Sequence, residues 1–145
     1  MRRRRFVNSV TLVTRTCALA LLLLVTMPEV RLSAAVNMVE PDDRGVQPAT
    51  ITMDSYSYSP NELSVQAGKP VELTLHNAAT FIPHSFVLED PDSGLHVRAE
   101  LSAGESQTIR FIPRHSGTFA FYCEKKLLFF KSHRDRGQEG RLEVR

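Results

Sequence analysis

The amino-acid sequence predicts an all-β domain, a β-sandwich, over residues 49–145. Between these limits, apolar residues alternate with polar residues in short runs, which is the period of a strand with one buried face. Clusters of Pro, Gly, Asn and Asp separate the runs, as turns separate the strands of a sandwich. No window of this region carries an apolar stripe at the helical period, so we expect strands to build the core.

The predicted strands follow one another closely. Turns are expected at residues 58–61, 67–70, 90–94 and 103–105. The core-facing positions of the strands are Ile51 and Met53; Leu63 and Val65; Val71, Leu73 and Leu75; His84, Phe86 and Leu88; Ile109 and Phe111; Phe119, Phe121 and Cys123; Leu142 and Val144. Because residues two apart in a strand share a face, His84 and Cys123 are expected to point toward the core.

The first 35 residues have the composition of an export signal. Arginines at positions 2–5 precede an apolar run from Cys17 to Met27, and small residues follow at 33–35. As a helix, the apolar run would rise about 16 Å, roughly half of a ~30 Å hydrocarbon core. We therefore expect residues 1–35 to be a signal peptide, with a retained N-terminal membrane anchor helix as the alternative. Residues 36–48 are polar and aperiodic, and are predicted to be a flexible linker to the domain at 49–145.

The charge of the chain changes once this leader is set apart. The formal net charge is +2, with 18 basic and 16 acidic residues. Six of the basic residues and one acid lie in the first 35 positions, which leaves 12 basic and 15 acidic residues, a net of −3. The sequence thus gives no indication of nucleic-acid binding. It predicts a periplasmic or otherwise exported protein, soluble or anchored by its N-terminal segment.

The mature part would contain a single cysteine, Cys123. An unpaired thiol in an oxidising compartment is a liability unless it pairs between chains or binds a metal. His84 and His133 flank it in sequence, and Gln138 follows. One thiolate, two imidazoles and a weak axial donor are the ligands of a blue-copper site, so we expect one copper ion per chain. A tetrahedral zinc site made from the same residues remains open.

Three segments also carry a resemblance to a known family. They are Tyr58–Asn77, Pro83–Leu88 and Phe111–Cys123, followed by His133 and residues 137–140. Together they resemble the cupredoxins, the plastocyanin and azurin group of small blue-copper proteins. The resemblance implies a Greek-key β-sandwich of the cupredoxin type. It also implies that His84, Cys123 and His133 are equatorial copper ligands, and that Gln138 stands where an axial methionine is usual.

The chain departs from that family in two ways. Nine residues separate Cys123 from His133, whereas the family's ligand loop is usually much shorter. Trebling a loop costs only about 1 kcal/mol of closure entropy, so the length leaves binding feasible. The axial residue also differs, because no methionine occurs after Met53. A glutamine oxygen is an accepted weak axial donor, although Gln138 could instead be a polar turn residue facing solvent.

These observations favour an exported, mononuclear copper-binding cupredoxin that carries single electrons. One alternative is a copper storage or delivery protein without a redox role, and another is a copper-free cupredoxin-like binding module. We expect no enzyme, because no catalytic constellation stands out in the sequence. The expected partner is a redox protein such as a cytochrome or an oxidase, and an uncleaved N-terminus would add a membrane contact.

The ligand loop is a candidate docking surface. Residues 124–136 carry five basic and two acidic side chains, a local net of +3 against −6 for the rest of the mature chain. Four apolar residues lie within this loop, next to two lysines. The candidate docking residues are Lys125, Lys126, Leu127, Leu128, Phe129 and Phe130. If part of the apolar run is exposed, the loop would suit an acidic redox partner or an anionic membrane surface; the alternative is that the four residues cap the core.

Overall fold

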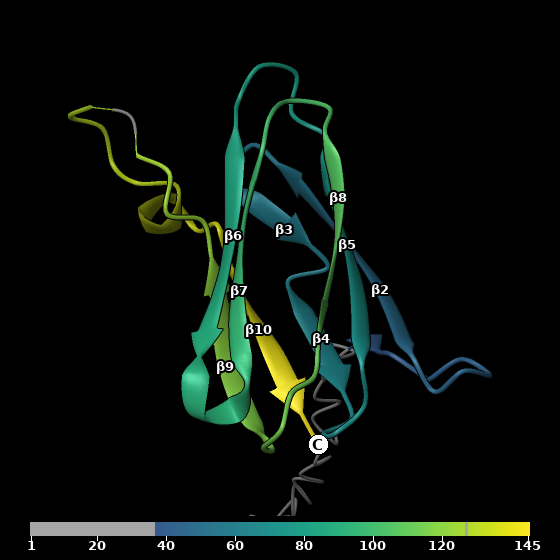
Figure 1. Ribbon diagram of the computed structural model, residues 1–145. Coiled ribbons are helices and arrows are strands. Elements are labelled where there is room, and N and C mark those ends of the chain that lie inside the picture. Colours follow the sequence, from purple (N-terminus) through teal and green to yellow (C-terminus); the bar gives the residue numbers. More distant parts are fainter. Residues whose placement is uncertain (1–36, 127) are drawn as a thin grey trace, which may run out of the picture. The chain divides into compact units, whose positions relative to one another are not determined.

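Two β-sheets face each other in the computed structural model, which describes residues 37–126 and 128–145 (Figure 1). The predicted all-β sandwich is confirmed, and two short 3-10 turns are the only helical elements of the described ranges. The elements are β1 (Asn37–Met38), β2 (Gln47–Asp54), β3 (Ser57–Ser59), β4 (Glu62–Val65), β5 (Val71–Asn77), β6 (His84–Asp90), η1 (Pro91–Ser93), β7 (Leu95–Leu101), β8 (Ser106–Phe111), β9 (Gly117–Tyr122), η2 (Arg134–Arg136) and β10 (Glu139–Val144).

The chain crosses repeatedly between the two sheets. The larger sheet has the order β1-β4-β10-β9-β6-β7, and the smaller one has the order β3-β2-β5-β8. Strand β10 lies parallel to β4 and antiparallel to β9, so the last strand closes the centre of the larger sheet. Strands β6 and β9 are antiparallel neighbours. The start of β6 and the end of β9 therefore lie at the same end of the sandwich.

The core follows the alternation of the sequence. In β5, Val71, Leu73 and Leu75 are buried while the residues between them are partly exposed. Burying a leucine side chain contributes about 1.5–3 kcal/mol, so this face drives the strand against the opposite sheet. Strand β6 differs, because its first five residues are all buried and it is thus covered on both faces.

Three aromatic rings form the part of the core nearest the two histidine-bearing segments. Tyr58 packs edge-on against Phe86 and Phe121, with ring centroids 5.9 and 5.2 Å away. Tyr58 was expected in a turn, but it lies in β3 and is buried because its ring fills this space. Gly140 of β10 lies flat against the Phe121 ring, where a β-carbon would collide with it.

The predicted linker needs correction at both ends. Asn37–Met38 pairs in parallel with β4, and β2 begins at Gln47 rather than at residue 49. Gln47 is fully buried, and its carboxamide bridges the backbone of Gln66 with bonds of 2.6 and 3.1 Å. Its polarity suggested a linker residue. In the structure these bonds pair the polar atoms of its carboxamide inside the sandwich.

The described residues, 37–126 and 128–145, belong to one compact unit. The expected signal peptide or anchor, residues 1–35, lies outside the described residues. Within the described ranges, no helix is long and apolar enough to cross a membrane.

Candidate metal centre

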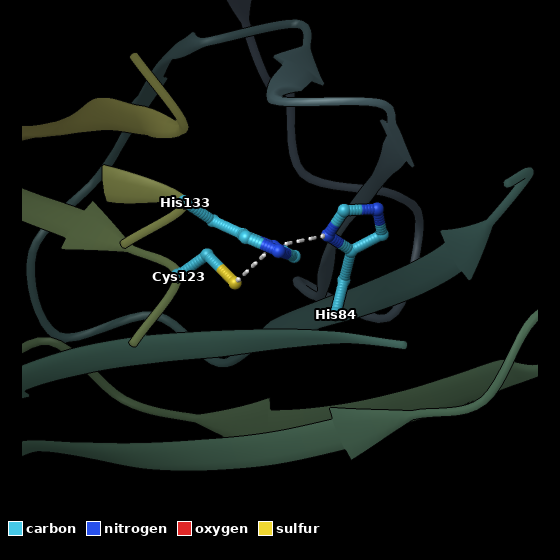
Figure 2. A group of neighbouring side chains, drawn as sticks. All are labelled: His84, Cys123 and His133. Atoms are coloured by element: carbon cyan, nitrogen blue, oxygen red, sulfur yellow. Dashed lines mark hydrogen bonds between the residues drawn. The ribbon is translucent and has the colours of Figure 1, made fainter. Parts of the chain in front are cut away.

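Three side chains converge at the end of the sandwich where β6 begins and β9 ends. His84 is the first residue of β6, Cys123 directly follows β9, and His133 precedes η2. Figure 2 shows the three side chains pointing toward one another. The Nδ1 atoms of His84 and His133 are 3.2 Å apart, and the Cys123 Sγ lies 3.5 Å from the His133 Nδ1. Sequence reasoning placed these three residues together, and the fold does so.

Their spacing fits one shared ion. Two nitrogen ligands at about 2.0 Å from a four-coordinate metal lie roughly 3.3 Å apart, and a nitrogen and a thiolate sulfur lie about 3.5 Å apart. All three candidate donor atoms fall within 4.8 Å of one another, and all three residues are buried. A thiolate with two imidazoles is a donor set that suits copper. The residues therefore fit a mononuclear copper ion.

Gln138 adds an unsatisfied acceptor beside these groups. Its side chain is fully buried, and its Nε2 donates a long bond of 3.4 Å to the Ser57 carbonyl. Its Oε1, like the Nε2 of His84, has no hydrogen-bond partner among the described residues. A buried acceptor without a partner costs about 1–3 kcal/mol. Gln138 is thus not a turn residue facing solvent, and its free oxygen is available to a cation.

Burial favours the neutral form of the two imidazoles. Desolvation lowers the pKa of His84 below 6.5, and the nearby His133 lowers it further. Desolvation is also the main cause that lowers the pKa of His133, with smaller contributions from Arg136 and Lys125. The Gln138 side chain acts in the opposite direction and raises the pKa of both histidines. Neutral imidazoles are the form that binds metals.

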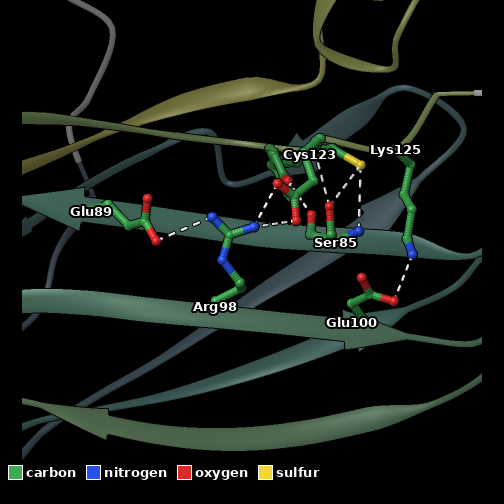
Figure 3. Close-up of polar contacts among 8 residues, drawn as sticks. Ser85, Glu89, Arg98, Glu100, Cys123 and Lys125 are labelled. Carbon is green, nitrogen blue, oxygen red and sulfur yellow. Dashed lines mark hydrogen bonds and ion pairs between the residues drawn. The ribbon is translucent and has the colours of Figure 1, made fainter.

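Ser85 fixes the position of the Cys123 sulfur. Its backbone N–H donates to the Sγ at 3.3 Å, and its hydroxyl lies 3.5 Å from the same atom (Figure 3). The hydroxyl oxygen also accepts from the Glu124 N–H at 3.0 Å. On the other side, the Tyr58 hydroxyl donates to the Ser85 carbonyl at 2.6 Å. Sequence reasoning missed Ser85; its place directly after His84 in a strand was the available signal.

The long segment between Cys123 and His133 is closed at its base. The His133 N–H donates to the Lys125 carbonyl at 2.8 Å, and the Cys123 N–H donates to the Gln138 carbonyl at 3.1 Å. Between these bonds, the described residues 126 and 128–132 therefore form an excursion outside this closed base. The ligands sit in a short hydrogen-bonded frame despite the length of the loop, which is how the unusual spacing is accommodated.

Ion pairs hold the start of the loop on the larger sheet. Arg98 of β7 binds the carboxylates of Glu89 and Glu124, and Lys125 binds Glu100 at 2.6 Å (Figure 3). Isolated surface pairs contribute only about 0–1 kcal/mol each. Here they act on two successive residues after Cys123, so they direct the chain as it leaves β9.

The excursion exposes its apolar residues. Leu128, Phe129 and Phe130 are 75, 99 and 58% exposed, so these described members of the candidate docking set do not cap the core. Leu127 lies outside the described residues. Beside the excursion is a hollow of about 450 Å³ that borders the His133 ring. Its walls come from three loops and are formed by Tyr56, Phe81, Ile82, Pro83, Lys125, Lys126, Phe130, Lys131, His133 and Arg136.

The remaining histidines lie elsewhere. His96 and His115 are exposed, and His76 is half-buried with its Nδ1 2.8 Å from the Ser106 hydroxyl. His115 precedes β9 while Cys123 follows it, so the strand separates the two. Tyr56, which the sequence did not single out, packs edge-on against His133 with ring centroids 5.1 Å apart.

Comparison with known proteins agrees with this geometry. The model of the cupredoxin-like domain family matches residues 16–137, most of the chain. The chain belongs to this family. The resemblance inferred from the sequence is thereby confirmed, and with it the cupredoxin fold. No curated protein matches the sequence of this cupredoxin-like chain significantly.

Solved structures show the same fold at low identity. A reduced auracyanin from the photosynthetic bacterium Roseiflexus castenholzii is 21% identical, with a TM-score of 0.56, over 68% of this chain and 96% of that chain. The metal-binding domain of a Cu(I)-exporting P-type ATPase from Streptococcus pneumoniae, solved with Cu(I), is 22% identical, with a TM-score of 0.58. The match covers 75% of this chain and 94% of that chain. A multicopper oxidase is 17% identical, with a TM-score of 0.57, over 75% of this chain and 46% of that chain. The cupredoxin fold and the His-Cys-His cluster together support copper binding.

Proposed function

We propose that this protein is an exported, mononuclear copper protein that carries single electrons. The observation that carries the proposal is the buried convergence of His84, Cys123 and His133 at spacings that fit one ion. Gln138 is the proposed axial donor, because its buried Oε1 has no partner among the described residues and its backbone bonds to both His133 and Cys123.

The chain's own residues favour rapid electron exchange. Copper, when bound, supplies the one-electron redox chemistry. His84 and Cys123 are set by adjacent strands, and Ser85 holds the sulfur with its backbone and its hydroxyl. A donor set fixed in this way changes little between two oxidation states. His133, at 9% exposure and bordering the open hollow, is the ligand nearest to a partner.

The proposed role is that of a carrier rather than an enzyme. If Gln138 coordinates, four protein donors surround the ion and leave no open position for a substrate, as a catalytic metal site requires. The proposed electron partner is a redox protein such as a cytochrome or an oxidase.

Copper delivery or storage is the second candidate. It is favoured by the excursion at residues 126–132, because an exposed loop next to His133 offers a way for the ion to leave. The structural similarity to the Cu(I)-bound domain of an exporting ATPase is compatible with such a role. A copper-free binding module is the third reading of the fold.

The location and processing of the chain are part of the proposal. The basic and apolar pattern of residues 1–35 supports export to the periplasm, with the domain released or held by its N-terminus. Determining the N-terminal residue of the protein purified from its native cells would separate cleavage from anchoring.

A visible absorption spectrum of protein loaded with Cu(II) tests the main claim. We expect one copper per chain and a strong thiolate-to-copper band, together with a reversible one-electron potential. Protein that takes up copper but passes it to an acceptor and shows no reversible couple would favour delivery. Folded protein that prefers Zn²⁺ and shows no visible band with Cu(II) would overturn the proposal. His115→Ala, far from the cluster, is the matched control and should change nothing.

A further inference from the structure

The metal-binding end of the domain carries an unusual concentration of exposed apolar side chains. Among the described residues, six large hydrophobic side chains are exposed, and four of them lie at this end. They are Phe81, Leu128, Phe129 and Phe130. Phe81 and Phe130 line the same hollow, so two separate loops bring these residues to one face.

Positive charge without a salt-bridge partner lies along the hollow that Phe81 and Phe130 line. Lys126, Lys131 and Arg136 line the same hollow, and none of them has a salt-bridge partner within the described ranges. The nearby acid, Asp135, accepts bonds from the N–H and the hydroxyl of Ser132 at 3.1 and 2.7 Å. Lys125 is already neutralised by Glu100. The face therefore combines apolar tips with a surplus of cations.

We propose that this face, made by Phe81, Arg136 and the described residues of the excursion, 126 and 128–132, binds an anionic lipid surface. The aromatic rings would enter the interface between headgroups and acyl chains, where amphipathic and aromatic side chains are favoured. The lysines and the arginine would lie at the level of the lipid phosphates, where each contributes to binding.

The shape of the face favours a membrane over an acidic protein. Phe129 is 99% exposed and is not among the residues that line the hollow, so it projects into solvent. Phe81 borders the hollow but is itself 87% exposed. Figure 1 shows the described part of the segment between β9 and β10, in yellow-green, extending away from the two sheets. A protein partner would need a matching cavity for each projecting side chain, whereas a fluid interface accommodates them without one.

The charge of the rest of the domain favours one orientation. Residues 124–136 carry a net of +3, and the other residues from position 36 onward carry −6. An anionic surface attracts the excursion and repels the remainder of the domain. The His133 edge would then face the lipid, close to any electron or copper partner embedded there. The inference itself does not depend on copper.

The sequence contains no tryptophan, which allows a direct test on the full chain. Phe129→Trp places a single fluorescent reporter at the tip of the excursion. Ile112→Trp is the matched control, because Ile112 is also exposed but follows β8 at the opposite end of the sandwich. Because both variants keep the N-terminal segment, any membrane contact made by that segment is the same in both.

The reporters are read with vesicles of phosphatidylcholine alone and of phosphatidylcholine mixed with phosphatidylglycerol, each containing brominated acyl chains as quenchers. We expect the tip tryptophan to be quenched and blue-shifted with the anionic vesicles, less so as salt rises, while the control stays unchanged. Adding Lys126→Gln or Lys131→Gln to the tip variant should lower the ratio of inserted to free tip about fivefold for each lysine, corresponding to about 1 kcal/mol per charge.

Two results would overturn the proposal. A tip tryptophan that stays unquenched with both kinds of vesicle would show that the face does not enter lipid. The positive charge of the face would then favour an acidic protein as the partner. Quenching that is equal on neutral and anionic vesicles, and indifferent to the lysines, would show that phosphate recognition plays no part. Loss of copper binding would leave either result unaffected, so this test and that of the proposed function fail independently.

Discussion

The base of the ligand loop and its excursion belong to one stretch of chain and behave in opposite ways. At the base, Cys123, His133 and Gln138 are buried and joined by backbone hydrogen bonds. Three residues after the Lys125 carbonyl has closed that base, the chain reaches Leu128, which is 75% exposed and has a positive φ of 44°. One loop thus contains both the backbone bonds that join the buried donors and three exposed apolar side chains.

This difference assigns two roles to two parts of the loop: the base positions the donor atoms, and the excursion is available for contacts. The frame that positions the donors is complete without residues 126–132, because His133 is returned to Lys125 by a direct bond. The excursion is then free to face solvent, a partner or a surface. Substitutions in the base should change copper chemistry, and substitutions in the excursion should leave it alone.

Cys123→Ser should give the largest effect, because it removes the thiolate of the base. A serine hydroxyl stays protonated and is a poor copper ligand, so the visible band should disappear. Copper affinity should fall by more than about 100-fold, since even changes outside a ligand set cost about 10–100-fold. Absorption spectroscopy and a copper titration measure both, with His96→Ala as the control. A band that survives in the serine variant would exclude Cys123 as a ligand.

Gln138→Met sharpens the role of the axial position. A thioether stabilises Cu(I) relative to an amide oxygen, so the reduction potential should rise. A tenfold change in relative preference corresponds to about 59 mV for one electron, and we expect a rise of at least this size. Redox titration of both proteins measures it. An unchanged potential and spectrum would mean that the carboxamide does not reach the ion.

Ser85→Ala tests the hydrogen bonds that support Cys123 and the start of the ligand loop. The part-buried Glu124 N–H would lose its acceptor, and the loss of such a hydrogen bond costs about 0.5–1.5 kcal/mol of unfolding free energy. Denaturant unfolding of the metal-free protein measures this loss. Ser106→Ala removes an exposed hydroxyl bonded to His76 and should change stability by less than about 0.5 kcal/mol. Equal effects from the two substitutions would remove Ser85 from the supporting frame.

Phe129→Ser should give the smallest effect. The side chain is 99% exposed, so unfolding free energy should change by less than about 0.5 kcal/mol, with the copper band intact. Phe121→Ala, in the core beneath the site, should by contrast cost about 3–5 kcal/mol. A large loss of stability or of copper binding from Phe129→Ser would show that the excursion is part of the frame after all.

The two-residue period of β-strands explains why much of the site could be predicted. His84 stands two and four residues before Phe86 and Leu88, and Cys123 stands two and four residues after Phe121 and Phe119. A period of two then fixes which face each side chain takes. Gln138 was identified only by its place after His133; its burial depends on packing that no local pattern reveals. Ser85 was missed because a polar residue in a doubly buried strand looks like an ordinary surface position until its partner sulfur is in view.

Other features could not be read from the sequence for physical reasons. Gln47 looks like a linker residue, because polarity does not reveal that its amide will bond to a distant backbone. The exposure of residues 128–130 was also open, since an apolar run is equally compatible with capping a core. The closure of the loop by the Lys125 carbonyl is a non-local backbone contact, which side-chain patterns do not encode.

The bond between Lys125 and His133 has a consequence for how such a protein can change over generations. It makes residues 126–132 a permissive insertion point, where length and composition can vary while the donor atoms keep their spacing. Mutations there could retarget the protein to a new surface or partner in a single step, without passing through a variant that has lost its metal. The same position is a natural place to graft a recognition peptide onto this scaffold.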